Sequence, residues 1–435
     1  MKELTRRRFV QTSMAAAAGV AAGLSSARAM GANEKIRLAV LGTANRGEQL
    51  IQATLPHQDA EIVALCDVYA PAMEQAAAKL PAKPDFYKDY RQILERKDID
   101  AVLVATPDHW HALQTIHACD AGKDVYVEKP LSLTVVEGRR MIEAARRNQR
   151  VVQVGLQRRA SAMFREMGAY LQNGGIGKVT VAHCYRITNM APNGIGKCQP
   201  TDPPPDLDWD LWLGPRAFQP FQENIAPYKF RWWKAYSSQI GNWGVHYFDL
   251  IRWLLAEEGP VSVSAHGGRF AVDDDRTIPD TMQATFEFAS GRLLVFGQYE
   301  ASGNEPFATG GEIELRGANG TLYSTDRGYE IVPERGGQFQ DPAPRMEPVK
   351  EVAKGGNQDL TTLHMRNFLD CVKSRQKPNC DVEDGYRSTL FAHLGNIALE
   401  TRSRLEWDPA AERITNNEAA NQWLQYEYRP PWKLV

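Results

Sequence analysis

From residue 36 the sequence alternates short apolar runs with amphipathic stretches, and this alternation restricts the fold more than any other feature. Apolar runs of about 4–8 residues separated by helical stretches of about 10–15 are typical of βαβ units, which build a parallel sheet. The predicted strands are Ile36–Leu41, Glu61–Cys66, Asp100–Ala105, Asp124–Val127 and Val151–Gly155. The predicted helices are Arg46–Leu55, Pro71–Lys79, His109–Ala121 and Thr134–Asn148, the last opened by a capping box, Thr134-x-x-Glu137. The sequence therefore predicts an α/β domain with a parallel sheet.

The first predicted strand leads directly into a glycine-containing turn and then a helix. Residues 42–47 read Gly-Thr-Ala-Asn-Arg-Gly, which is the G-x-G-x-x-G phosphate-binding pattern with alanine in place of the middle glycine. The first glycine allows the tight turn, the middle one the close approach of a pyrophosphate, and the last one helix packing. Because alanine adds only a methyl group, we expect this turn to hold a dinucleotide at the helix N-terminus.

An acidic residue stands where a dinucleotide-binding sheet requires it. Asp67 ends the second predicted strand, 20 residues after Gly47. In such sheets an acidic side chain here accepts hydrogen bonds from the adenosine ribose hydroxyls. Its charge also repels the 2′-phosphate of NADP, so the sequence favours NAD. An ordinary turn aspartate is the alternative, and the register of strand, turn and helix argues against it.

The length of 435 residues predicts two domains. We expect a Rossmann domain at residues 34–155 and a substrate and oligomerisation domain at residues 156–435. The second part has longer predicted strands, which are typical of a large, mostly antiparallel open sheet of an α+β domain. These strands are Val179–Ile187, Val261–Phe270, Thr281–Phe288, Leu293–Tyr299, Glu312–Arg316 and Thr321–Ser324. Helices at Phe164–Asn173, Val245–Leu255, Asp359–Ser374 and Glu383–Ser403 would pack on one side, and residues 189–208 would form a long loop.

Residues 1–29 have the pattern of an export signal. A twin-arginine motif at residues 5–10 precedes a mildly apolar run, residues 14–24, and a small-x-small cleavage site at residues 27–29. The apolar run is too short to cross a hydrocarbon core of about 30 Å. We therefore expect export through the twin-arginine pathway to the periplasm. Because this route carries folded proteins, NAD would leave inside the protein and be tightly bound.

Charge and cysteine usage exclude several other classes of protein. The net charge of −2 gives no reason to expect a nucleic-acid or anionic-membrane partner, and no later run is apolar enough for stable membrane insertion. The 6 cysteines lie far apart without a CxxC pair, so we expect free thiols rather than a disulfide framework. His109 and His111 begin a helix and point to different faces, so no metal is expected.

Further polar motifs follow predicted strands, at the edge where parallel sheets bind ligands. They are Thr-Pro-Asp-His-Trp-His at residues 106–111, Glu-Lys-Pro at 128–130, and Gly-Asn-Trp-Gly-Val-His-Tyr-Phe-Asp at 241–249. With the glycine turn, they resemble the Gfo/Idh/MocA oxidoreductases, which include glucose–fructose oxidoreductase and inositol dehydrogenase. The resemblance covers about residues 34–435. It implies a homodimer or tetramer that transfers a hydride to or from a hydroxyl carbon of a sugar, sugar derivative or cyclitol.

The resemblance also implies roles for individual residues. Lys129 and His246 would be the catalytic pair. The cofactor would be bound by Gly42, Thr43, Ala44, Asn45, Arg46, Asp67, Thr106, Pro107, His109, His111, Glu128 and Gln157. Candidate substrate-binding residues are Tyr185, Arg186, Trp233, Asn242 and Asp249, because flat indole faces suit a sugar ring and polar side chains bind its hydroxyls.

The chemistry supports this catalytic pair. Hydride removal from a secondary alcohol requires removal of the hydroxyl proton, and a histidine accepts a proton near neutral pH. A lysine beside the oxidised nicotinamide would have a lowered pKa and would hydrogen-bond the same oxygen. The alternatives are a surface lysine and a core histidine.

One position departs from the family pattern. The family often has an aspartate four residues before the catalytic histidine, where this sequence has Asn242. Asparagine binds a hydroxyl but accepts no proton, which leaves a second interpretation open: an NAD-dependent glycosidase that oxidises a ring hydroxyl transiently and breaks the glycosidic bond by elimination. A carbohydrate-binding protein without catalysis is the third, and the retained lysine and histidine argue against it.

Overall fold

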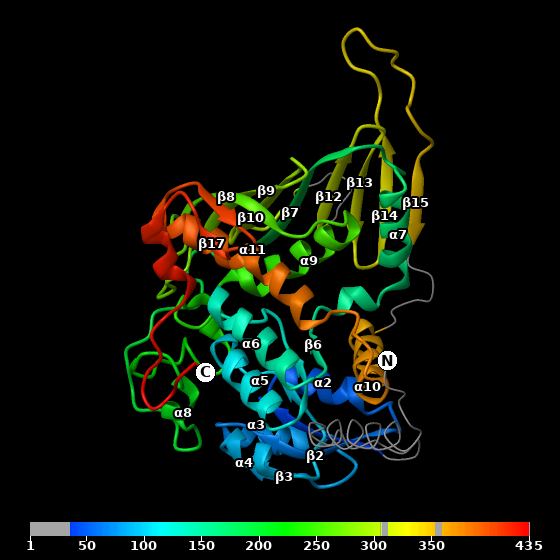
Figure 1. Ribbon diagram of the computed structural model, residues 1–435. Helices are drawn as coiled ribbons and strands as arrows, with labels where there is room; N and C mark the ends of the chain where they lie inside the picture. Colours follow the sequence, from blue (N-terminus) through cyan, green and yellow to red (C-terminus); the bar gives the residue numbers. More distant parts are fainter. Residues whose placement is uncertain (1–34, 305, 307–311, 353–358, 435) are drawn as a thin grey trace, which may run out of the picture. The chain divides into compact units, whose positions relative to one another are not determined.

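The computed structural model describes residues 35–304, 306, 312–352 and 359–434 (Figure 1). The predicted export signal at residues 1–29 lies outside the described residues and stays a prediction. Ile36–Val435 forms one compact unit, so the domain boundary that we expect after residue 155 also stays a prediction.

The first sheet is parallel throughout and has six strands. Its strands are β1 (Ile36–Leu41), β2 (Ala60–Cys66), β3 (Asp85–Tyr87), β4 (Ala101–Val104), β5 (Asp124–Val127) and β6 (Val152–Val154). The spatial order is β3-β2-β1-β4-β5-β6. The chain therefore reverses its direction of travel across the sheet between β1 and β4, and ligands bind at the carboxyl ends of strands at such a point. The predicted Rossmann sheet is confirmed.

Helices connect these strands, as the alternating pattern predicts. They are α2 (Arg46–Thr54), α3 (Ala70–Ala77), α4 (Tyr90–Glu95), the short η1 (Asp108–Trp110), α5 (His111–Asp120) and α6 (Val135–Arg147). The capping box at the start of α6 forms in both directions between Thr134 and Glu137. Strand β3 and helix α4 are not among the predicted elements, because three and six residues are too short to show a period.

The second sheet has eleven strands and is mixed, mostly antiparallel, as expected. Its strands are β7 (Val179–Asn189), β8 (Pro260–Gly268), β9 (Thr281–Phe288), β10 (Leu293–Tyr299), β11 (Ala301–Ser302), β12 (Ile313–Gly317), β13 (Gly320–Thr325), β14 (Gly328–Pro333), β15 (Val349–Val352), β16 (Leu405–Asp408) and β17 (Arg413–Ile414). The order is β15-β14-β13-β12-β7-β10-β9-β8-β16-β17, with β11 paired to β7. Strands β7 and β10 run parallel to each other.

Helices lie on one side of this sheet, facing the Rossmann part in Figure 1. They are α7 (Ala162–Gln172), α9 (Val245–Leu254) and α11 (Val382–Thr401), while α10 (Leu360–Ser374) packs against α2. Phe248 of α9 stacks on Phe391 of α11, with ring centroids 5.2 Å apart. Both rings meet Phe286 of the sheet edge-on, and Phe248 meets Phe296 in the same way, at 5.2 to 5.4 Å. Strand β9 alternates buried and more exposed residues, so its other face is open.

Two segments outside the sheets extend across the carboxyl edge of the Rossmann sheet. The predicted loop follows β7, and after it residues 206–236, here called the cover segment, carry α8 (Trp209–Leu213) and η3 (Lys229–Trp232). Residues 426–434, here called the C-terminal arm, run beside the cover segment in Figure 1. Both segments pack through buried tryptophans, including Trp212 and Trp432.

The remaining sequence expectations concern cysteines and membranes. All 6 cysteines are free thiols, and each except Cys198 is buried. Among the helices of the described residues, none is long and apolar enough to cross a membrane.

Candidate active site

A cavity of about 440 Å³ lies at the carboxyl ends of β1, β2, β4 and β5. Loops of the Rossmann part form one wall, and the cover segment and the start of α9 form the other. Most of the predicted site residues line this cavity: Gly42, Ala44, Asn45, Arg46, Asp67, Thr106, Pro107, His111, Glu128, Lys129, Gln157, Arg186, Asn242 and His246. The fold therefore brings together residues that are more than 200 positions apart in the sequence.

The glycine turn has the geometry that the pattern predicts. Gly42 has φ +82, and a Cβ there would lie 2.7 Å from the backbone nitrogen of Thr106. A Cβ on Gly47 would lie 2.0 Å from the carbonyl oxygen of Gly42. Both positions therefore require glycine, and the backbone between them faces the cavity at the N-terminus of α2.

Asp67 follows β2 and is held from two sides. Its Oδ2 accepts hydrogen bonds from the backbone nitrogen (2.7 Å) and Oγ1 (3.0 Å) of Thr43, and its Oδ1 accepts one from the backbone nitrogen of Tyr69 (3.0 Å). Burial raises the pKa of Asp67, and these hydrogen bonds oppose the rise. Thr43 itself is fully buried and does not line the cavity, so it positions Asp67 rather than contacting a ligand.

An ion pair joins the first turn of α2 to the end of β5. Arg46 Nε donates to Glu128 Oε1 at 2.7 Å, and both side chains line the cavity. Arg46 Nη2 is buried without a hydrogen-bond partner among the described residues. Gln157, at the start of η2 (Gln157–Ala160), likewise has a buried Oε1 without a partner there. These two unpaired atoms fit a ligand that has both anionic oxygens and an amide donor.

The two histidines after β4 have different surroundings. His111 lies between two carbonyl oxygens, with Nδ1 2.8 Å from Pro130 and Nε2 2.9 Å from Thr106. His109 does not line the cavity, contrary to the predicted cofactor contact. Its Nε2 lies 2.8 Å from the backbone oxygen of Trp212, its ring packs against Tyr236, and burial lowers its pKa to about 3. Because successive helical residues face different directions, His109 anchors the cover segment.

The predicted catalytic pair meets in the cavity. Lys129 Nζ donates to the backbone oxygen (3.0 Å) and Oδ1 (2.8 Å) of Asn242. Burial lowers the pKa of Lys129 to about 8. His246 lies in the first turn of α9, and its pKa falls below the usual range because of burial and then the charge of Lys129. His246 is therefore neutral at neutral pH, and Lys129 becomes neutral as the pH rises through about 8.

Three predicted substrate-binding residues lie away from the cavity. Tyr185 precedes Arg186 on β7, where successive side chains point to opposite faces, so the two cannot share the cavity. Trp233 is buried within the cover segment, where its Nε1 donates to the backbone oxygen of Asn224 at 2.7 Å. Asp249 is buried and accepts hydrogen bonds from Arg159 at 2.8 to 3.0 Å, so it holds α9 in place.

Other cavity residues are absent from the sequence prediction. Trp232 lines the cavity instead of its neighbour Trp233, because the chain at the end of η3 directs one indole into the cavity and the other into the core. Five of the ten tryptophans lie between residues 209 and 243, and this enrichment indicates aromatic contacts with a ligand but does not separate Trp232 from Trp233. Arg231 and Gln239 also line the cavity, and nothing in their sequence context distinguishes them.

The cover segment contacts residues at the carboxyl edge of the Rossmann sheet. Leu207 forms a β-bridge with Tyr69, and the backbone oxygen of Trp212 accepts a hydrogen bond from Trp110 Nε1 at 3.1 Å. The C-terminal arm contacts both the cover segment and the Rossmann part. Arg429 Nη1 lies 2.6 Å from Asp210 Oδ1, and the Trp432 ring lies edge-on to Trp110 at 4.8 Å. The part of the cavity beside Asp67 and Tyr69 is thus enclosed by segments from both parts of the fold.

A parallel sheet with this turn and acidic strand end, closed by a second domain, defines an NAD-binding oxidoreductase. Comparison with known families agrees. Residues 36–156 match the "Oxidoreductase family, NAD-binding Rossmann fold", and residues 178–434 match the "Oxidoreductase family, C-terminal alpha/beta domain". The chain belongs to the Gfo/Idh/MocA oxidoreductase family.

Individual relatives differ in how much of the chain they match. Myo-inositol 2-dehydrogenase of Thermotoga maritima is 24% identical over 382 residues, which is 84% of this chain and 97% of that protein. Glycosyl hydrolase family 109 protein 1 of Shewanella sp. (strain ANA-3) is 32% identical over 125 residues, 27% of each chain. The crystal structure of myo-inositol 2-dehydrogenase from Lactobacillus plantarum shares the fold, with a TM-score of 0.61 and 19% identity, and covers 86% of this chain and 99% of its own.

Proposed function

We propose that this protein oxidises or reduces a hydroxyl-bearing carbon of a sugar, sugar derivative or cyclitol, with NAD as the cofactor and Lys129 and His246 as the catalytic pair. The observation that carries this proposal is that the two side chains share one cavity with the glycine turn and Asp67. The similarity to an inositol dehydrogenase over most of the chain supports the substrate class.

The geometry favours Lys129 as the proton acceptor, which reverses the roles that the sequence suggests within the pair. A neutral amine has two N–H bonds and one lone pair, and Asn242 offers one acceptor to each N–H. The lone pair is then free to take the substrate hydroxyl proton. The pKa of about 8 suits this task near neutral pH. His246, whose pKa is lowered further, would hydrogen-bond the same oxygen.

The cavity walls fit a nicotinamide dinucleotide. When bound, NAD supplies the hydride acceptor of the reaction. Asp67 would bind the adenosine ribose, the turn at residues 42–47 the pyrophosphate, and Gln157 Oε1 the carboxamide. Arg46 Nη2 would meet a phosphate oxygen. Gly42, Ala44, Asn45, Thr106, Pro107, His111 and Glu128 would form the remaining contacts of the cleft.

We also propose that NAD stays bound through purification and export. The contacts of the cover segment and the C-terminal arm with the Rossmann part support slow release of NAD. The twin-arginine pattern of residues 1–29 supports export of the folded holoprotein. The open, partly polar face of the large sheet supports a homodimer or tetramer. Light scattering of the purified protein tests the oligomer, and fractionation of cells expressing the full chain tests the periplasmic location.

One experiment tests the central claim. The purified protein is denatured, and the released small molecules are identified by mass. We expect about one NAD per chain and little NADP. Native protein is then mixed with myo-inositol and a panel of sugars without added cofactor, and absorbance is followed at the wavelength of NADH. Absence of a bound or bindable dinucleotide, or absence of NADH formation across the panel with NAD present, refutes the proposal.

A second function is favoured by one specific observation. The 32% identical segment shared with a family 109 glycosyl hydrolase, together with neutral Asn242, is compatible with redox-neutral cleavage of a glycoside. In that case nitrophenyl glycosides release nitrophenol without net NADH. Release of nitrophenol by the holoprotein, lost in Lys129→Ala, would replace dehydrogenation as the assigned activity.

A further inference from the structure

Two arginines without a directly paired carboxylate line the wall of the cavity that β7 and the cover segment form. Three arginines line the cavity, namely Arg46, Arg186 and Arg231. Arg46 is paired with Glu128. Among the residues that the structure describes, neither Arg186 nor Arg231 has a carboxylate within 4.0 Å. A buried or half-buried guanidinium without a counter-ion is costly, which points to a charge that the ligand supplies.

Arg186 is positioned close to the catalytic pair. Its Cζ lies 4.1 Å above the ring of Trp243, and that ring lies 6.4 Å from the ring of His246. The stacked indole fixes the plane of the guanidinium, which is thereby preorganised for bidentate contact. Arg186 Nε is buried and has no hydrogen-bond partner in the described part of the chain.

Arg231 adds a second positive charge from the cover segment. It stacks over Tyr228 and Phe230 at 4.4 and 4.5 Å, and its Nη1 donates to the backbone oxygen of Tyr228 at 3.0 Å. Its charge contributes to the lowered pKa of Lys129, which places it near the reacting end of the cavity.

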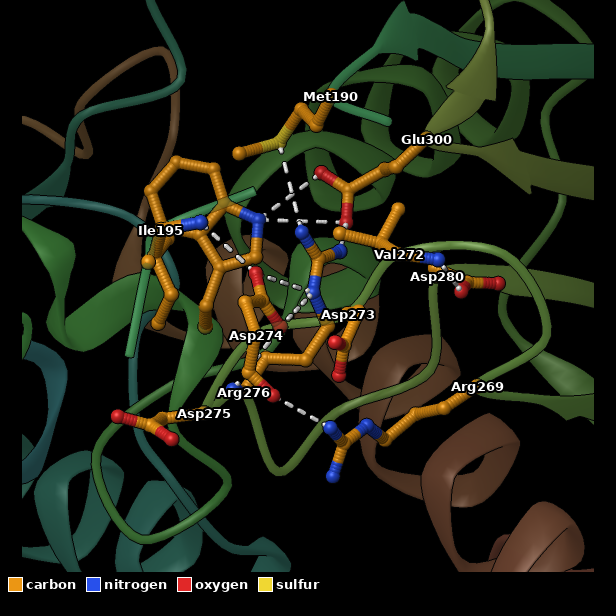
Figure 2. Close-up of polar contacts among 12 residues, drawn as sticks. Met190, Ile195, Arg269, Val272, Asp273, Asp274, Asp275, Arg276, Asp280 and Glu300 are labelled. Carbon is orange, nitrogen blue, oxygen red and sulfur yellow. Dashed lines mark hydrogen bonds and ion pairs between the residues drawn. The ribbon is translucent and has the colours of Figure 1, made fainter. Parts of the chain in front are cut away.

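Glu300 interacts electrostatically with Arg186, but its carboxylate forms an ion pair with Arg276 instead. Figure 2 shows Glu300 beside the guanidinium of Arg276, with Asp274 on another side of the same group. Glu300 Oε2 accepts from Arg276 at 2.6 Å, and both its oxygens accept from Trp232 Nε1 at 3.1 and 3.2 Å. Asp274 holds Arg276 Nε at 2.8 and 3.0 Å. This buried network fixes Trp232 at the cavity wall, and it directs the Glu300 carboxylate toward Arg276 and Trp232, with no ion pair to Arg186 among the described residues.

We propose that the substrate carries a carboxylate, as in a uronic or aldonic acid, and that Arg186, assisted by Arg231, binds this carboxylate while the hydroxyl carbon lies against Lys129 and His246. The inference rests on the proposed function and narrows its substrate class. An arginine fork matches the two oxygens of a carboxylate, and such charge-assisted pairs are stronger than the hydrogen bonds that a neutral sugar offers.

Matched substrates test the proposal with the holoprotein. The pairs are glucose with glucuronate, galactose with galacturonate, and glucose 6-phosphate as a third anion. We expect kcat/KM for the uronates to exceed that for the neutral partners by at least about tenfold. Preference for the neutral sugars, or for the sugar phosphate over the uronates, overturns the proposal.

Variants separate recognition from catalysis. Arg186→Met should lower kcat/KM for the uronates by about 10- to 100-fold more than kcat/KM for the neutral sugars, mainly through a higher KM, while Arg186→Lys should recover part of the loss. Arg140→Met removes an exposed positive charge paired with Glu143 and serves as the matched control. An unchanged uronate preference in Arg186→Met overturns the proposal.

A binding measurement keeps this test independent of turnover. If no polyol or acid is oxidised although NAD is bound, the proposed function fails. Calorimetric titration with glucuronate and glucose, on wild type and Arg186→Met, then still decides whether the cavity selects a carboxylate. Equal affinity of the wild type for glucuronate and glucose refutes the inference by itself.

Discussion

Lys129 and Asn242 are joined by two hydrogen bonds, from Nζ to the side-chain oxygen at 2.8 Å and to the backbone oxygen at 3.0 Å. Asn242 lies in a π-helical turn, Ile240–Gly244, that leads into α9, so one local irregularity sets the distance between the lysine and His246. Because asparagine is neutral, it orients the amine without adding negative charge, and burial keeps the pKa of Lys129 near 8.

Asn242→Asp should move the pH dependence of oxidation to higher pH. A carboxylate in hydrogen-bond contact favours the ammonium form and raises the pKa of Lys129 by about 1–3 units. If the neutral amine is the base, wild-type kcat/KM rises as pH passes through about 8, and in the variant the rise comes later. At pH 7 the variant should therefore lose about tenfold or more of its activity.

The measurement is a full pH–rate profile of wild type and variant. Asn242→Ser leaves a neutral residue at this position, so kcat/KM should rise with pH near the wild-type pH. If the pH of this rise is unchanged in Asn242→Asp, Lys129 is not the titrating base.

Asp67→Ala should weaken NAD binding and relax discrimination against NADP. The substitution removes an acceptor for the ribose hydroxyls and the charge that repels a 2′-phosphate. We expect Kd for NAD to rise by about 10- to 100-fold, as for loss of hydrogen bonds to a charged group. Fluorescence titration of apoprotein with NAD and NADP measures both effects, with exposed Asp202→Ala as control. Unchanged NAD/NADP selectivity would remove Asp67 from the cofactor site.

The Rossmann half was predictable because local signals there agree with the tertiary structure. Each strand except β3 is an apolar run, Gly42 and Gly47 satisfy steric demands within a few residues, and the capping box marks the start of α6. Residues that directly follow these strands, such as Lys129, reach the cavity because the carboxyl ends of parallel strands share one edge. The arrangement follows from strand order alone.

The substrate side was less predictable because its side-chain directions depend on contacts between distant segments. The choice between Trp232 and Trp233 is made by a short turn and by Glu300, which lies far along the chain. Asp249 carries the residue type of a ligand contact, and Arg159 engages it in the core. Composition indicated a sugar-binding region in this segment but not which member of each neighbouring pair faces it.

Gly47→Ala should destabilise the turn and reduce cofactor content. The added Cβ would lie 2.0 Å from the carbonyl oxygen of Gly42, so the turn and α2 must move apart. We expect a loss of about 1–3 kcal/mol in the free energy of unfolding, as for overpacking, and less NAD after purification. Thermal unfolding and mass analysis of released NAD measure the two. Gly259→Ala, where nothing lies within 4 Å, is the control, and equal effects of both changes would contradict the steric argument.

Loosening the C-terminal arm should speed release of NAD without altering the chemistry. Arg429 binds Asp210 at 2.6 Å and the backbone oxygen of Gly214 at 3.1 Å, and Trp432 packs on Trp110 and under Arg91. Arg429→Gln with Trp432→Ala removes these fastenings while leaving the cavity walls in place. We expect the dissociation rate of NAD to rise by about tenfold or more, because the lost contacts are worth at least about 1.4 kcal/mol.

The rate is measured by chasing bound NAD with an excess of a fluorescent analogue. Lys433→Ala, an exposed change in the same arm, should match the wild type. Since the proposed catalytic pair lies just after β5 and on α9, kcat with saturating NAD should also stay close to wild type. A double variant that releases NAD at the wild-type rate would show that the arm does not restrain the cofactor, and retention would then depend on the cavity contacts alone.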